Sequence, residues 1–162
     1  KAVKREGRET TEGLVALATA GGVGAAVELA CETDFVAKTD DFGTLAKSLA
    51  EAVVADASLA SVDALSEAKI GGEVVKERIG AAIGRLGENV VLRRVSRIAL
   101  DGAGVVTGYV HAGGKLGVLI GLGSTGSADK LASLGRDLAM HVAAADPSPV
   151  AVDRSGVPAE LV

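Results

Sequence analysis

With 162 residues the chain is long enough for one domain or two small subdomains, and because 48% of its residues are hydrophobic but only 2% aromatic, the core must be built from Ala, Val, Leu and Ile. A net charge of −4 without a basic stripe argues against direct nucleic-acid binding. The single Cys excludes an intramolecular disulfide and a cysteine-based metal site, and the chain lacks the run of about 18 apolar residues that a membrane-spanning helix needs.

The first part of the chain predicts a β-hairpin. Residues 1–12 are polar and are expected to form a connector outside the core. Two apolar runs follow, at 14–19 and 23–31, and a Gly-Gly pair that permits a tight turn separates them. Cys31 shares the parity of the apolar positions in the second run. We therefore expect it to be a buried, structural thiol.

Residues 32–38 join this hairpin to a predicted helix and should therefore lie at the surface. The chain has only two Phe, and Phe35 stands in this junction between Asp34 and Val36. A large apolar side chain exposed there contributes little to folding but is suited to contact a protein partner. The residues alone leave one alternative open, in which Phe35 folds back onto the core and Asp34 caps a local turn.

Apolar side chains at helical spacing predict three helices after this junction. Their expected ranges are 40–56, 62–69 and 73–86. Either Thr39 or Asp40 can cap the first helix by accepting a hydrogen bond from an amide of its first turn. Gly87 should end the third, because glycine readily adopts the left-handed conformation found after helices.

Alternating β-branched residues after the third helix predict three strands. Their expected ranges are 89–100, 105–112 and 115–122. Short turns that contain glycine separate them, so we expect one three-stranded antiparallel meander. A last helix with one apolar stripe should follow. The stripe consists of Leu131, Leu134, Leu138 and Val142.

The two halves of the chain repeat one pattern, in which a hairpin precedes a helix. Neither half could bury its apolar face well alone. We therefore predict an α+β fold with a duplicated core of two subdomains, each an antiparallel β-hairpin or meander followed by packed helices. The expected division is a connector at 1–12, an N-terminal subdomain at 13–87 and a C-terminal subdomain at 88–162.

Catalytic, metal and nucleotide sites are weakly supported by the sequence. A cysteine hydrolase would pair Cys31 with His111 or His141, but neither histidine has an acidic residue at a telling spacing. The acidic residues around Asp34 lack the spacing of a calcium loop, and the glycine-rich turns lack the fingerprints of nucleotide-binding loops. We predict no catalytic residue, no metal and no cofactor.

Three stretches carry a resemblance to one family. The first is Cys31-Glu32-Thr33-Asp34-Phe35-Val36-Ala37 with Phe42 after it, the second is Tyr109-Val110-His111 leading into Gly117-Val118-Leu119, and the third is residues 137–144. In this order they resemble translation elongation factor Ts, the guanine nucleotide exchange factor for elongation factor Tu. The first stretch is similar to the signature of that family.

The resemblance implies a protein that binds elongation factor Tu, in the bacterial cytoplasm or an organellar counterpart, and promotes GDP release. In this family the matching loop enters the nucleotide-binding domain of elongation factor Tu. The resemblance implies Phe35 as the wedge, Asp34 as a polar arm near the magnesium site, Thr33 and Val36 as the frame, and His111 as a contact from the second half.

Members of this family begin with a small helical module and continue into a helical hairpin, and neither is present in these 162 residues. We therefore expect the chain to be part of a longer gene product, whose second subdomain stops before the hairpin. The main alternative function is a noncatalytic ribosome- or translation-associated binding module with the same fold. A homodimer formed through exposed sheet edges is a separate hypothesis.

Overall fold

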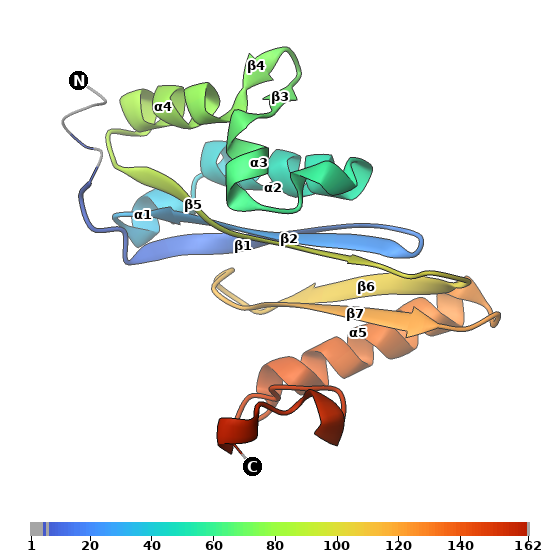
Figure 1. Ribbon diagram of the computed structural model, residues 1–162. Coiled ribbons are helices and arrows are strands. Elements are labelled where there is room, and N and C mark those ends of the chain that lie inside the picture. The colour runs from blue at the N-terminus through green and yellow to red at the C-terminus, as the bar shows by residue number, and fades with distance from the viewer. Residues whose placement is uncertain (1–4, 6, 162) are drawn as a thin grey trace.

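The computed structural model describes residue 5 and residues 7–161, and it arranges them in four layers (Figure 1). Helices cover one face of a main sheet, a second sheet lies against the other face, and a last helix covers the second sheet. The main sheet has the order β1-β2-β5, and its strands are Glu12–Ala20, Val23–Cys31 and Val90–Ala99. The second sheet pairs β6 (Gly104–Val110) with β7 (Gly117–Gly123). This mixture of helices and antiparallel hairpins confirms the predicted α+β class.

The predicted first hairpin is confirmed. β1 and β2 pair in antiparallel register from Glu12↔Cys31 to Ala20↔Val23. The two-residue turn between them contains Gly21 with φ 56°, a left-handed conformation that glycine adopts without a steric cost.

Three helices after the hairpin are where they were predicted, with different ends: α2 (Asp40–Ala55), α3 (Val62–Glu67) and α4 (Val75–Leu86). The helical turn α1 (Asp34–Ala37) and the 3-10 turn η1 (Ala57–Leu59) were not predicted. Thr39 caps α2, because its hydroxyl accepts a hydrogen bond from Phe42 N at 3.3 Å. Gly87 ends α4 with φ 84°. α4 starts later than expected because Glu73–Val74 form a short strand, β4, that pairs with β3 (Lys69–Ile70).

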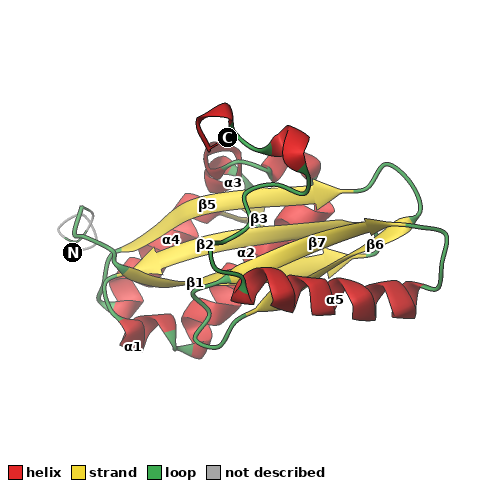
Figure 2. Ribbon diagram, turned by 90° about the horizontal axis from the view of Figure 1, so that it is seen from below, coloured by secondary structure: helices red, strands yellow, loops and turns green. Residues whose placement is uncertain are grey.

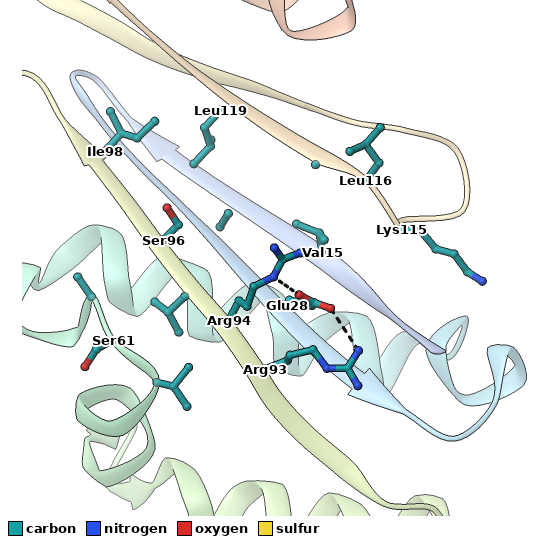
Figure 3. Close-up of a pocket in the computed structure, with 15 residues that line it drawn as sticks. Val15, Glu28, Ser61, Arg93, Arg94, Ser96, Ile98, Lys115, Leu116 and Leu119 are labelled. Atoms are coloured by element: carbon teal, nitrogen blue, oxygen red, sulfur yellow. Dashed lines mark hydrogen bonds and ion pairs between the residues drawn. The ribbon is translucent and has the colours of Figure 1, made fainter. Parts of the chain in front are cut away.

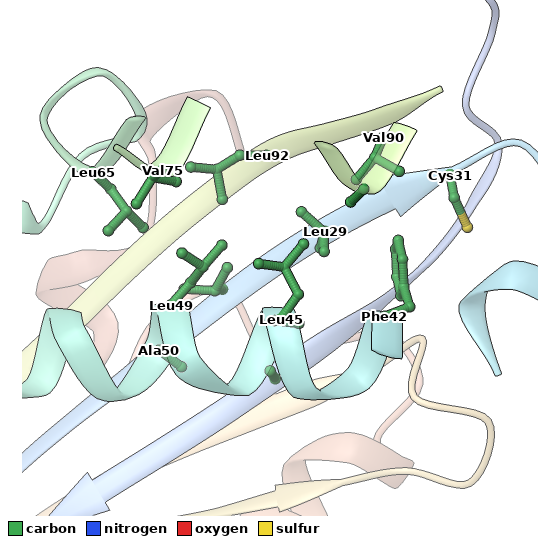
Figure 4. Close-up of a cluster of buried hydrophobic side chains, with 14 of the residues drawn as sticks. Leu29, Cys31, Phe42, Leu45, Leu49, Ala50, Leu65, Val75, Val90 and Leu92 are labelled. Carbon is green, nitrogen blue, oxygen red and sulfur yellow. The ribbon is translucent and has the colours of Figure 1, made fainter. Parts of the chain in front are cut away.

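The hydrophobic core lies between α2 and the main sheet (Figure 4). α2 turns its apolar stripe towards the sheet, and α3 and α4 close the core at one side. Cys31 lies at one end of this core with no exposed surface, as its parity predicted. The largest fully buried side chains are Phe42, Leu29, Leu49, Leu65, Val27, Val53, Val75 and Cys31.

The predicted three-stranded meander is wrong, because β5 joins the main sheet. β5 pairs with β2 in antiparallel register, with a register shift between Glu28 and Leu29. This pairing places Val90 and Leu92 in the core under the helices, where they are 3% and 6% exposed. If β5 paired with β6 instead, Val90 and Leu92 would not be buried in this core. The division into subdomains at 13–87 and 88–162 stays a prediction.

The second sheet packs closely on the main sheet because glycines face the contact. A Cβ atom at Gly24 of β2 would lie 2.4 Å from Val106 Cγ1 of β6. A Cβ atom at Gly108 would lie 2.7 Å from Leu17 Cδ1 of β1. Both distances are shorter than carbon atoms tolerate, so larger residues would force the sheets apart.

The helix α5 (Ala128–Ala144) covers the outer face of the second sheet (Figure 2). Of the predicted stripe, Leu131 and Val142 are half-buried, but the two middle residues are exposed. Leu134 and Leu138 are 51% and 38% exposed, whereas Gly135 and Ala139 are buried. The helix approaches β6 so closely that a Cβ atom at Gly135 would lie 2.3 Å from Thr107 Cγ2. Close packing of small residues therefore decides which face is covered.

Two 3-10 turns, η2 (Arg154–Gly156) and η3 (Ala159–Leu161), follow α5. In Figure 1 this end of the chain lies beside α5, on the side away from the sheets. Among the residues that the structure describes, no helix is both long and apolar enough to cross a membrane.

Candidate functional site

The junction between β2 and α2 is a single helical turn, α1. Thr33 caps this turn, with its hydroxyl accepting from Val36 N at 3.4 Å. Its carbonyl oxygen accepts from Ala37 N at 3.3 Å. The surface position was predicted, but the helical conformation was not, because four residues are too few for a recognisable period.

Neighbouring side chains of α1 have opposite environments. Phe35 is 80% exposed, whereas Val36 is 8% exposed and belongs to the core. The alternative in which Phe35 folds back onto the core is therefore wrong. An aromatic side chain in water contributes almost nothing to folding, so its position suits contact with another molecule.

Asp34 is held in its ionised form beside Phe35. Lys38 Nζ lies 2.6 Å from Asp34 Oδ2, one helical turn away. This hydrogen bond lowers the pKa of Asp34 below its ordinary value, and the charges of Lys38 and Lys115 act in the same direction. The turn therefore presents an aromatic ring and a carboxylate side by side at neutral pH.

The short segment between α4 and β5 holds this turn from behind. Glu88 accepts hydrogen bonds from Thr33 N at 2.9 Å and from Thr33 Oγ1 at 2.5 Å. The next residue, Asn89, is 3% exposed, and its backbone N donates to Glu32 Oε1 at 2.7 Å. Neither residue was predicted from the sequence. A polar pair after a helix-ending glycine has the same pattern as an ordinary exposed turn.

Cys31 supports the turn and is unsuited to nucleophilic chemistry. Its thiol donates a hydrogen bond to Thr33 O at 3.1 Å. Burial raises the pKa of Cys31 to about 11, with a further contribution from the negative charge of Glu88. A cysteine hydrolase requires an accessible, readily ionised thiol. Elsewhere in the described chain, no group of three or more His, Cys, Asp or Glu could hold a metal ion.

His111 lies in the exposed turn between β6 and β7, where Tyr109 Oη is 3.0 Å from its Nδ1. This turn approaches the start of β1, because Lys115 Nζ lies 2.6 Å from Glu12 Oε2 and Gly114 O accepts from the backbone of β1. The fold thus brings the turn of His111 and α1 towards the same end of β1. A joint role for His111 and Phe35 stays a prediction.

A groove of about 750 Å³ opens between the two sheets, beside the part of β5 that the second sheet leaves uncovered (Figure 3). Leu119 and Ile98 contribute apolar surface to it. At its mouth Glu28 forms ion pairs with Arg93 and Arg94, so these charges neutralise one another in part. None of the residues predicted for function lines this groove.

Sequence comparisons identify relatives of this chain. A family model described as elongation factor TS matches residues 32–162. The chain belongs to the elongation factor Ts family. The predicted resemblance is thereby confirmed, and the match begins directly before the turn that carries Phe35.

Curated relatives named elongation factor Ts align over the whole chain. The protein of Azoarcus sp. (strain BH72) is 48% identical over 164 residues, and that of Xanthobacter autotrophicus is 43% identical over 169 residues. Each match covers 100% of this chain but only 52% and 53% of the relative. The chain therefore spans about half the length of the curated relatives it matches.

Proposed function

We propose that this chain takes part in translation elongation as a guanine nucleotide exchange factor for elongation factor Tu. Phe35 is the wedge, Asp34 is the polar arm near the magnesium and phosphate site, and Thr33 and Val36 frame them. His111 adds a contact from the second half. The observation that carries this proposal is the 80% exposure of Phe35 on a turn whose next residue is buried in the core.

The proposed mechanism needs no covalent step. An exchange factor must bind the nucleotide-free partner more tightly than the GDP-bound partner, and by reciprocity it then weakens GDP binding by the same factor. An exposed wedge on a fixed turn suits this task, because the turn does not have to order itself on binding. The chain would therefore promote release without an enzymatic active site.

The test is the release rate of a fluorescent GDP analogue from elongation factor Tu, with and without the chain. We expect the parent to accelerate GDP release, and Phe35→Ala to weaken this effect about tenfold to a hundredfold. The reason is that the complex loses about 1.5–3 kcal/mol of free energy from apolar burial. Leu134→Ala is the matched control, because it removes another exposed apolar side chain, from α5. Equal acceleration by parent and Phe35→Ala would contradict the wedge assignment.

The alternative is a binding module without exchange activity. The chain spans only about half of its relatives' length, which is the observation that keeps this alternative open. Binding to elongation factor Tu in a pull-down, without faster GDP release, would favour it over exchange.

A further inference from the structure

Thr33, which precedes the exposed pair, has each of its polar groups engaged. Its N–H and its hydroxyl both donate to the carboxylate of Glu88, at 2.9 and 2.5 Å. Its carbonyl oxygen accepts from the Cys31 thiol and from Ala37 N, at 3.1 and 3.3 Å. The N-cap residue of α1 is thus fixed by Cys31 and Glu88 outside the turn as well as by Ala37 within it.

Glu88 itself stands on a rigid backbone. The preceding Gly87 ends α4 in a left-handed conformation, with its N–H donating to Ile83 O at 3.1 Å. The following Asn89 is 3% exposed, and its side chain donates to Arg8 O at 2.8 Å. Because both neighbours are held, the Glu88 carboxylate reaches Thr33 from a fixed point.

A helical turn of four residues is not stable alone, because nucleation costs more than one turn of hydrogen bonds returns. Phe35 cannot stabilise α1 either, since it is exposed. Two charge-assisted contacts hold the turn: the exposed single bond from Lys38 to Asp34, and the two partly buried bonds from Thr33 to Glu88. Charge-assisted bonds are about twice as strong as neutral ones, and exposure to solvent weakens them. Glu88 is therefore the polar contact whose loss should loosen the turn most.

We propose that Glu88 is a positioning residue that keeps the turn of Phe35 in its binding conformation. This inference rests on the proposed function and adds a residue to it. If the turn is formed in only a fraction of the chains, the apparent affinity for the partner is reduced to that fraction of its full value. The fully bound complex still has its wedge. Loss of Glu88 should thus change the concentration dependence of exchange and leave its maximal rate unchanged.

The test compares Glu88→Gln with the parent in the GDP-release assay over a range of chain concentrations. We expect the half-saturating concentration to rise about tenfold, which corresponds to about 1.4 kcal/mol, with the same maximal rate. Thr33→Val removes the hydroxyl from the other side of the contact, together with its cap bond from Val36 N, and should also raise the half-saturating concentration. The matched control is Glu67→Gln on α3, which disrupts an exposed ion pair with Lys76 of α4.

A second readout uses the isolated chain and needs no partner. Glu88→Gln should accelerate hydrogen exchange of the Thr33 amide about tenfold, because the uncharged Gln side chain has only one acceptor oxygen for the two Thr33 donors. With fluorophenylalanine in place of both Phe residues, the Phe35 signal should move towards its unfolded position, while the signal of the buried Phe42 stays and confirms the fold. Both readouts unchanged in Glu88→Gln and Thr33→Val would overturn the inference. If they change but the parent does not accelerate GDP release, the positioning role stands and the proposed function fails.

Discussion

Cys31 illustrates how its surroundings set the chemistry of one residue. The parity of β2 predicted its burial, and the structure leaves it no exposed surface. Burial raises the pKa of Cys31 from its ordinary value of 9.0 to about 11. The same environment that makes the thiol a poor nucleophile keeps it protonated as a donor to Thr33 O.

This pKa difference predicts how stability depends on pH. Below the unfolded pKa of about 9 the thiol is protonated in both states, so its contribution is complete. As the pH rises from about 9 to 11, the unfolded chain releases the proton while the native chain keeps it, and about 2 kcal/mol of unfolding free energy is lost.

Urea unfolding of the parent and of Cys31→Ala, with a reductant, at about pH 8 and about pH 10.5 measures this loss. Groups that titrate in both proteins cancel in the comparison. We expect the parent to lose about 2 kcal/mol more than the variant between the two conditions. Equal losses would contradict the pKa assigned to the thiol.

The two ends of the helix α2 are capped by groups from different parts of the chain. Its first turn is capped by Thr39, one of two local candidates that the sequence offered. Its last turn is capped by Arg97, which lies on β5 and donates from Nε to Val53 O at 2.9 Å and from Nη2 to Val54 O at 3.3 Å. The second cap exists because β5 pairs with β2.

Arg97→Met should lower the free energy of unfolding by about 1.5 kcal/mol, since two carbonyl groups lose a charged donor while the aliphatic stem is kept. Arg94→Met is the matched control on the same strand. It disrupts an ion pair at an Arg side chain that is 78% exposed, and should change stability by less than about 0.5 kcal/mol. Urea unfolding of the three proteins measures both effects, and equal losses in the two variants would argue against the cap.

For the whole molecule, the contact between the two sheets depends on residues without side chains. Gly24 on β2 faces Val106 on β6 at a distance that leaves no room for a methyl group. Val is stiff about its first torsion, so it cannot turn away without cost. The stacking of the sheets, and with it the approach of the His111 turn to β1, rests on such positions.

Gly24→Ala should therefore lower the free energy of unfolding by about 1–3 kcal/mol. Gly84→Ala is the control, because Gly84 lies exposed on α4, where an added Cβ atom would meet no other part of the chain within 4 Å. This variant should stabilise the helix by about 0.5–1 kcal/mol. Adding Val106→Ala to Gly24→Ala should recover part of the loss, because it removes the clashing methyl groups. Additive losses in that double variant would show that the two residues do not clash.

Local patterns predicted much of this fold because they report short-range preferences. The first hairpin, the positions of α2, α3 and α4, and the burial of Cys31 follow from periodicity, capping and glycine turns. For Phe35 the same patterns left two outcomes open. The reason is that a lone aromatic residue in a junction has no period that distinguishes a buried ring from an exposed one.

Most helices and strands, the family resemblance and the stretch that carries Asp34 and Phe35 could be predicted from the residues alone. The pairing of β5 with β2, the burial of small residues of α5 in place of Leu134 and Leu138, and the contact of Glu88 with Thr33 became clear only from the folded chain. Each of these outcomes is a choice between distant partners of similar local preference. Such choices are settled by the burial of Val90 and Leu92, by close approach at glycines and by hydrogen bonds to buried polar groups. These contacts exist only once the chain has folded.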